Sequence, residues 1–247
     1  MEELIKKIKS KKPLDRLDNT FVQEFVEDFF KTNYKIKKKF SEGLLKKKDE
    51  ELIIKSVRNE LNKMYGQFWN SDDLELEAHK SSKERLEFYD KVYSFIFSIT
   101  GKPKKVLDLG CGLNPLSYKD IKDGIYFIAT ELTNYDCEKI RYFFKKNEIK
   151  GEVIKSDLRT YSKFPEVDVC FMFKILDSLE SKGHLLSEKL IKEIKAKYIV
   201  ASFSTQNIKG KKMNYPRRGW IEIMLQRLGL IYTKYEESNE IFYIIKI

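Results

Sequence analysis

The apolar positions of roughly the first hundred residues recur at the spacing of amphipathic helices, and glycine is scarce there. One segment, TFVQEFVEDFF, follows an Asn19–Thr20 cap and carries its apolar stripe at Phe21, Val22, Phe25, Val26, Phe29 and Phe30. A second, DEELIIKSVRNELNKMYG, carries its stripe at Ile53, Ile54, Val57, Leu61 and Met64 and stops at Gly66. The pattern predicts packed helices with the lysine runs 37–39 and 46–48 on their outer faces.

The period of the pattern changes from Lys104 onward. Short apolar runs typical of strands occupy residues 105–109, 125–130, 151–154, 168–173 and 198–203. They alternate with helical segments at about 134–147, 183–196 and 217–228, which is typical of a parallel sheet with crossover helices. The tail LIYTKYEESNEIFYIIKI has no helix between its two strand-like runs, so it predicts an antiparallel hairpin on the sheet edge. We therefore expect a doubly wound α/β domain in the second half.

Composition narrows the function classes. With 42% hydrophobic and 13% aromatic residues, the chain of 247 residues can bury a core and is not a disordered segment. The net charge of +10 fits a polyanionic partner, although lysine-rich solvated surfaces give the same balance. Three cysteines without CxxC spacing and only two histidines argue against a zinc site or a disulfide scaffold. The apolar runs are too short to span a bilayer, so we expect a cytoplasmic protein without a membrane segment.

Doubly wound sheets bind ligands at the carboxyl ends of their strands. The candidate residues at those ends are Asp108, Gly110, Gly112, Glu131, Asp157 and Lys174. The glycines of VLDLGCGLNPLS permit backbone angles that side chains block, but the third glycine of a dinucleotide fingerprint is missing. Glu131 stands where a carboxylate can accept both ribose hydroxyls, and Asp157 stands where an adenine amino group can lie. Any one of these acids alone is equally a helix cap; together they favour S-adenosyl-L-methionine over NAD.

The segment upstream of the glycines predicts a helix that begins with a capping box of Ser81 and Glu84. Its inward stripe would be Leu86, Tyr89, Tyr93, Ile96 and Phe97. On the residues alone, His79 and Arg85 are equally well explained as polar residues at the start of this helix with no functional role.

Four motifs of the chain, in order and spacing, resemble the aminoglycoside-resistance 16S rRNA methyltransferases of the Arm/Rmt group. They are HKSSKERLEFYDKVYSFIFS, VLDLGCGLNPL, FKILDSLE and VASFSTQNIKGKKM, and the resemblance covers about residues 75–213. It implies a Rossmann-like class I S-adenosyl-L-methionine-dependent methyltransferase domain over residues 76–247. Residues 1–75 would then be a helical RNA-binding extension. The implied reaction is methyl transfer to N7 of a guanine in the decoding region of 16S-type rRNA.

The resemblance also assigns residues to the cofactor site. His79, Ser82 and Arg85 would border it, and Arg85 would pair with the methionine carboxylate. The others are Gly110 and Gly112 at the methionine and ribose, Glu131 at the ribose, and Asp157 and Leu158 at the adenine. Asp108 and Lys174 join the predicted cofactor site from their places at the strand ends. Two residues depart from the family pattern, because Ser82 replaces a threonine and Ser204 replaces the proline of a Ser-Phe-Pro-Thr loop.

The chemistry of guanine N7 fits these residues. N7 carries an in-plane lone pair and no proton, so we expect catalysis by positioning, with no general base and no metal. Methylation of exocyclic amines usually uses an Asn/Asp-Pro-Pro-aromatic strand end, which MFKILD is not. Methylation of pyrimidine carbon needs a thiolate, whereas Cys170 lies in an apolar run and Cys111 stands at a packing position. Ribose methylation commonly uses a Lys–Asp–Lys–Glu set. Lys174 is a candidate for one member, and the sequence offers no candidates for the other three.

One stretch predicts the RNA contact. No acidic residue occurs from Lys195 to Ile221, a stretch that follows the fifth predicted strand and also holds Tyr215 and Trp220 as stacking surfaces. The predicted RNA-binding residues are Ser202, Ser204, Lys209, Lys211, Lys212, Arg217 and Arg218. We expect a monomer whose partner is the small ribosomal subunit or its rRNA. Three alternatives remain on the residues: a methyltransferase for another RNA, one for a small molecule, and a non-catalytic cofactor-dependent RNA-binding protein.

Overall fold

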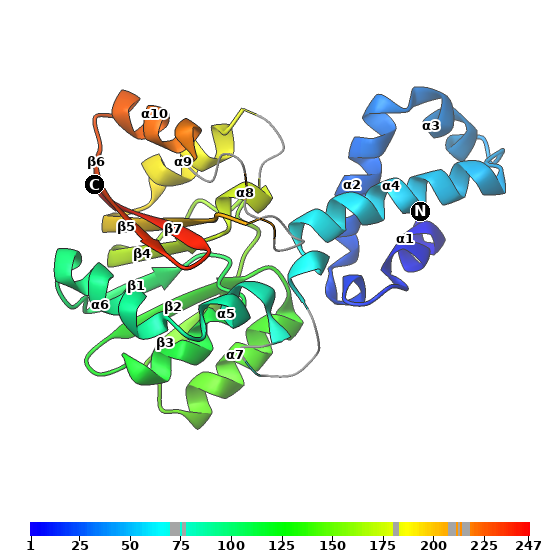
Figure 1. Cartoon of the computed structure of the whole chain (residues 1–247). Helices are drawn as coiled ribbons and strands as arrows, with labels where there is room; N and C mark the ends of the chain where they lie inside the picture. Colours follow the sequence, from blue (N-terminus) through cyan, green and yellow to red (C-terminus); the bar gives the residue numbers. More distant parts are fainter. Residues whose placement is uncertain (70–74, 76–77, 180–182, 207–210, 212, 214–217) are drawn as a thin grey trace. The chain divides into compact units, whose positions relative to one another are not determined.

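A computed structural model of the chain describes residues 1–69, 75, 78–179, 183–206, 211, 213 and 218–247 (Figure 1). The chain divides into two compact units, Met1–Trp69 and Asn70–Ile247. None of the helices within these described ranges is long and apolar enough to cross a membrane.

The first unit is helical. Its elements are α1 (Glu2–Lys9), η1 (Leu14–Arg16), α2 (Asn19–Thr32), α3 (Tyr34–Ser41), α4 (Lys47–Met64) and η2 (Gly66–Phe68). Fully buried residues such as Ile8, Val22, Val26, Ile53 and Leu61 form its core, as the helical period predicts. Phe25 and Phe29 of the predicted stripe are only partly buried, and Asp18 rather than Asn19 or Thr20 occupies the N-cap position of α2.

The second unit is built on a seven-stranded sheet in the order β3-β2-β1-β4-β5-β7-β6. The strands are β1 (Lys105–Asp108), β2 (Tyr126–Glu131), β3 (Gly151–Lys155), β4 (Val167–Phe173), β5 (Ala196–Ser204), β6 (Ile231–Glu237) and β7 (Glu240–Lys246). The first five are parallel, and β7 pairs antiparallel with both β5 and β6. Strand order reverses between β1 and β4, so the carboxyl ends of these two strands mark the expected ligand edge. The predicted doubly wound sheet and its terminal hairpin are confirmed.

Helices cover both faces of this sheet (Figure 1). They are α5 (Lys80–Arg85), α6 (Tyr89–Thr100), η4 (Asn114–Asp120), α7 (Asn134–Lys146), α8 (Leu176–Leu179), α9 (Leu185–Glu193) and α10 (Gly219–Arg227). Alternate residues of each strand enter two separate cores: Val106 packs with α6 and α7, whereas Leu107 packs with α9 and α10. This two-sided burial explains why the central strands are apolar along their whole length.

The predicted single helix after residue 81 is wrong in two respects. It breaks at residues 86–88 into α5 and α6, with Leu86 37% exposed and Phe88 buried. The helix also begins two residues earlier than predicted, with His79 at the N-cap position, so Ser81 and Glu84 form no capping box. Glu84 instead forms an ion pair with Lys174. The break separates the short helix that carries Arg85 from the long helix that packs on the sheet.

Candidate functional site

The loop after β1 has a backbone that only glycine accepts easily. Gly110 and Gly112 have φ values of 57° and 55°, in the left-handed region. A Cβ on Gly112 would lie 2.5 Å from His79 Cε1, and one on Gly110 would lie 2.6 Å from Ile175 Cδ1. Glycine is therefore required at both positions for two reasons: the backbone angles, and the side chains packed where a Cβ would lie.

A buried polar network around Asp108 supports this loop. Asp108, at the end of β1, accepts a hydrogen bond from Asn114 Nδ2 (2.8 Å) and another from the Tyr118 hydroxyl. Tyr93 and Ser117 share a further hydrogen bond of 2.8 Å. Burial raises the pKa of Asp108 to about 6, and the second carboxylate oxygen of Asp108 is buried without a hydrogen-bond partner. The sequence marked Asp108 as a ligand contact, and the structure gives it a role in holding the loop.

Glu131, at the end of β2, holds the other side of the loop. Its carboxylate accepts hydrogen bonds from the backbone N–H groups of Gly112 (2.6 Å) and Leu132 (2.9 Å). Thr130 Oγ1 accepts a third from the N–H of Gly110 (3.1 Å). Burial, helped by the nearby charge of Asp136, raises the pKa of Glu131 to about 7. The glycine loop and the predicted ribose-binding carboxylate are thus in direct contact.

Arg85 lies in a buried cluster of charges beside this loop. It is 1% exposed, and its Nε donates to both carboxylate oxygens of Glu240, at 3.0 and 2.9 Å. Burial alone would lower the pKa of Arg85, but Glu240 raises it, so the guanidinium stays charged. Burial would raise the pKa of Glu240, yet the charges of Arg85 and Lys174 hold it below its usual value.

Lys174 completes the cluster from the end of β4. Its Nζ lies 2.6 Å from Glu84 Oε2 and 3.1 Å from Glu240 Oε2. Its φ of 56° is unusual for a residue with a side chain, and its backbone N–H donates to the carbonyl oxygen and hydroxyl of Ser202. Such strained residues gather at functional sites, where the surrounding contacts hold them.

Three polar atoms at α5 and α6 are buried without a hydrogen-bond partner: Ser82 Oγ, Arg85 Nη2 and Tyr89 Oη. These groups lie close together: burial raises the pKa of Tyr89, whereas the charge of Arg85 and side-chain interactions of the Tyr89 hydroxyl with Arg85 and Ser82 oppose that rise. Buried donors and acceptors of this kind are rarely left unsatisfied. An anionic group with several acceptor oxygens fits them, which is the chemistry of the methionine carboxylate. His79 is held neutral nearby, because burial and the charges of Arg85 and Lys174 lower its pKa to about 3.

Asp157 and Leu158 follow β3. Leu158 is buried, and its Cδ1 would lie 3.6 Å from a Cβ on Gly110, so it packs against the loop. Its place beside an adenine stays a prediction. Asp157 is partly exposed and is held by Arg159, whose Nε lies 3.0 Å from each of its carboxylate oxygens. Arg159 carries no motif by which the sequence alone would single it out.

Six of the seven predicted RNA-binding residues fall into three groups. Lys209, Lys212 and Arg217 lie outside the described residues, as does Tyr215. Lys211 is exposed, and Ser204 is partly exposed. Arg218 donates to Asp177 (2.9 Å) and to the carbonyl oxygen of Ser204 (3.1 Å).

Two expectations about this stretch need correction. Ser202 is fully buried and donates its hydroxyl to Glu240, so it holds the charged cluster and presents no surface to RNA. Lys195 and Lys197 lie at the amino end of β5, the opposite end from Ser204, and Lys197 forms an ion pair with Asp168 (2.6 Å). A strand of this length spans about 30 Å, so these two lysines are remote from the candidate site.

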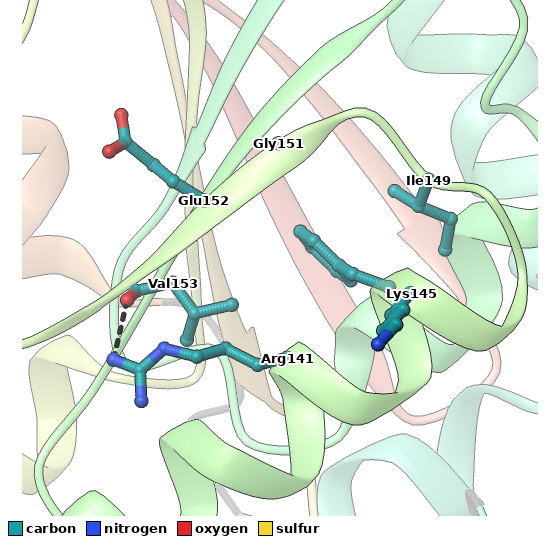
Figure 2. Close-up of a pocket in the computed structure, with 7 residues that line it drawn as sticks. Arg141, Lys145, Ile149, Gly151, Glu152 and Val153 are labelled. Atoms are coloured by element: carbon teal, nitrogen blue, oxygen red, sulfur yellow. Dashed lines mark hydrogen bonds between the residues drawn. The ribbon is translucent and has the colours of Figure 1, made fainter.

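A cavity of about 400 Å³ lies elsewhere, beside the edge strand β3 and the helix α7 (Figure 2). Arg141 lines it and donates to the main-chain carbonyl of Val153 (2.8 Å). None of its lining residues belongs to the loop or the charged cluster. Arg141 satisfies an edge carbonyl there, which is one way to protect an exposed strand edge.

The most important residue that sequence analysis missed is Glu240. It begins an apolar strand and is fully buried. The antiparallel register sets it opposite Ser204, at the carboxyl end of β5. The sequence feature that could have identified Glu240 is an acidic residue at the start of the run EIFYIIKI, in the predicted hairpin on the sheet edge.

The chain resembles known proteins in both sequence and fold. The model of a family described as ribosomal RNA methyltransferase (FmrO) matches residues 73–244. The chain belongs to this family. One curated relative is a 16S rRNA (guanine(1405)-N(7))-methyltransferase of Proteus mirabilis, 28% identical over 177 residues, which are 69% of this chain and 63% of that protein. A relative of the same description from Serratia marcescens is 29% identical over 174 residues, covering 69% of this chain and 68% of that protein.

Solved structures share the fold of this family member. The 16S rRNA methyltransferase RmtF, in complex with S-adenosyl-L-homocysteine, has a TM-score of 0.80 at 17% identity, covering 99% of this chain and 97% of that one. The 16S rRNA methylase RmtB has a TM-score of 0.73 at 21% identity, covering 99% and 97%. The resemblance to the Arm/Rmt group and the predicted methyltransferase fold with a helical N-terminal region are confirmed.

Proposed function

We propose that this chain is an S-adenosyl-L-methionine-dependent methyltransferase that acts on guanine N7 in 16S-type rRNA. The observation that carries the proposal is the arrangement at the strand ends. A glycine loop gripped by Glu131 lies next to buried, unsatisfied donors of Arg85 and Ser82, in a member of the rRNA methyltransferase family. The curated relatives, named as guanine-N7 methyltransferases of 16S rRNA, support the choice of target.

The residues present fit the cofactor. Arg85 Nη2 and Ser82 Oγ would receive the methionine carboxylate, because both are buried without partners. Glu131 would accept the ribose hydroxyls on the lone pairs that the Gly112 and Leu132 amides leave free. Asp157 would receive the adenine amino group, with Arg159 fixing its carboxylate.

The chemistry asks little of the side chains beyond position. The donor supplies an electrophilic methyl group on a sulfonium sulfur, and guanine N7 attacks with a lone pair that needs no deprotonation. Neutral His79 and ion-paired Lys174 can orient the reactants and exclude water. Cys111 and Cys170 are buried, and burial raises the pKa of both thiols well above the usual value, which disfavours a thiolate mechanism.

The RNA contact would come from two regions. The acid-free segment after β5 follows the strand that ends beside Lys174, and Lys211 is exposed within it. The N-terminal unit adds α3, which has no buried residue and exposes Lys35, Lys37 and Lys38. We therefore retain the N-terminal unit as an RNA-binding extension and the small ribosomal subunit or its rRNA as the partner.

We also propose a cytoplasmic monomer, because 16S-type rRNA is a cytoplasmic substrate and the sheet edges are protected. The edge strand β6 exposes Lys234 and Glu236, which disfavour pairing with a second sheet. Light scattering of the purified chain measures the oligomeric state directly.

The experiment that tests the function supplies labelled S-adenosyl-L-methionine to the purified chain. Intact small subunits, protein-free 16S rRNA and buffer alone are the three acceptor conditions. We expect label in RNA, and label in neither RNA sample would overturn the proposal. S-adenosyl-L-homocysteine binding by calorimetry, measured alongside, would then distinguish a binding protein without turnover from a chain that does not bind the cofactor.

A further inference from the structure

The hairpin that ends the chain brings a buried carboxylate to the candidate site. Glu240 is the first residue of β7, and the residues that follow it in this strand are apolar as far as Ile245. Because β7 runs antiparallel to β5, its beginning lies at the carboxyl ends of the parallel strands, opposite Ser204. A fully buried glutamate in a strand is costly unless its charge is paired.

The way in which Glu240 is paired is informative. Both of its oxygens lie within 3.0 Å of Arg85 Nε, while Ser202 donates a hydroxyl and Lys174 lies at 3.1 Å. The carboxylate therefore sits at the Nε position of the guanidinium and leaves Nη2 buried without a partner. The centroid of the Phe173 ring lies 4.9 Å from the guanidinium carbon, a cation–π contact that helps to hold the group.

We propose that Glu240 is a positioning residue that aims Arg85 Nη2 at the carboxylate of the methionine moiety. The inference rests on the proposed function and adds a residue to it. Held at Nε by Glu240 and against Phe173, the guanidinium has one orientation, so its free N–H groups are preorganised for a second anion. Without the carboxylate, Arg85 would lose the partner that holds its fork in place.

The charge balance of the cluster supports this reading. Arg85 and Lys174 carry two positive charges, and Glu84 and Glu240 carry two negative ones. The amino-acid end of the ligand is itself a zwitterion with no net charge. A cluster that is already neutral can receive it without leaving an uncompensated buried charge.

The test compares two ligands that differ in the amino-acid end alone. S-adenosyl-L-homocysteine carries that end, whereas 5′-methylthioadenosine keeps the adenosine and lacks the carboxylate. Calorimetry on the full chain would measure both ligands in the wild type, Glu240→Gln, Glu240→Asp and Glu237→Gln. Glu237 is a matched control, because it pairs in register with Glu240 on the opposite strand of the same hairpin, and the ion pair it forms is with Lys91.

We expect Glu240→Gln to weaken homocysteine-product binding about tenfold or more, the effect of losing one charge-assisted hydrogen bond. Methylthioadenosine affinity should stay within about twofold in the same variant, since no group that would hold adenosine is disturbed. Glu240→Asp should lie between the wild type and Glu240→Gln, and Glu237→Gln should match the wild type. Adding Glu240→Gln to Arg85→Lys should weaken product binding little further, because Arg85→Lys alone already removes the guanidinium that Glu240 would orient.

The outcomes separate this inference from the proposed function. Failure of the wild type to bind the homocysteine product would overturn both. Product binding that is normal in the wild type and unchanged in Glu240→Gln would overturn the positioning role alone. Equal loss of both ligands in Glu240→Gln and Glu240→Asp would assign Glu240 to folding and also overturn it.

Discussion

Cofactor binding should depend on pH through Glu131. Its carboxylate is buried, accepts the Gly112 and Leu132 amides at 2.6 and 2.9 Å, and has its pKa raised to about 7, first by burial. Two amide hydrogen bonds leave roughly two of four acceptor sites for the ribose hydroxyls. Protonation removes an acceptor site and adds a donor, so the ionised form is the one that binds ribose.

The magnitude follows from that pKa. A carboxyl with a pKa of about 7 is roughly one-tenth ionised at pH 6 and nine-tenths ionised at pH 8. If only the ionised form binds, affinity for S-adenosyl-L-homocysteine falls about tenfold between pH 8 and pH 6. The ribose hydroxyls favour the ionised form and lower the pKa in the complex, so binding at pH 7 releases roughly half a proton.

Isothermal calorimetry checks both values. Titrations at pH 6, 7 and 8 give the affinity, and buffers of different ionisation enthalpy at pH 7 give the proton count. Glu131→Gln is the matched control, because it keeps the side-chain size and cannot titrate. It should bind more weakly and lose the part of the pH dependence that is due to Glu131. A wild-type affinity that stays constant from pH 6 to 8, with no proton released, would refute the reasoning.

Three further predictions concern the loop and the RNA. Gly112→Ala should destabilise the protein by about 1–3 kcal/mol more than Gly124→Ala in thermal denaturation, because both have positive φ but only the first new Cβ meets a neighbour, His79. The raised pKa of Asp108 gives stability that is present at low pH and lost as pH rises through about 6. The melting temperature of wild type relative to Asp108→Asn should therefore fall between pH 5 and pH 7, and a constant difference would contradict this. Lys211→Glu should weaken subunit binding and reduce its salt slope by about 1–2 units, with product affinity unchanged; an unaltered slope would move the contact to the N-terminal helices.

Much of the fold was predictable because its signals are local. The alternation of apolar runs predicted β4 and α7 to within a residue or so of their observed bounds. Thr133, whose side chain accepts from the N–H of Asp136, begins α7 as an N-cap residue should. The glycines at 110 and 112 were recognisable because a left-handed backbone needs glycine.

The remaining features depend on contacts between distant segments. Glu240 meets Arg85 across 155 residues, and only the sheet order brings them together. The loop motif predicts an RNA contact at Ser202, because its place in the motif does not reveal that it is fully buried. Lys195 and Lys197 belong to the acid-free segment in the sequence, but the direction of β5 places them at the opposite end of the strand. The break at residues 86–88 escaped prediction because the apolar spacing runs through it.

The most direct test of the central claim is to map the methylated atom. Small subunits treated with this chain and S-adenosyl-L-methionine would be digested to nucleosides and analysed by mass spectrometry. The rRNA would also be reduced and cleaved with aniline, which breaks the chain at N7-methylguanosine. We expect N7-methylguanosine and one new scission in 16S-type rRNA, both absent without the donor. Methyl groups found instead on an exocyclic amine, a pyrimidine carbon or a ribose oxygen would contradict a mechanism that rests on positioning without a general base.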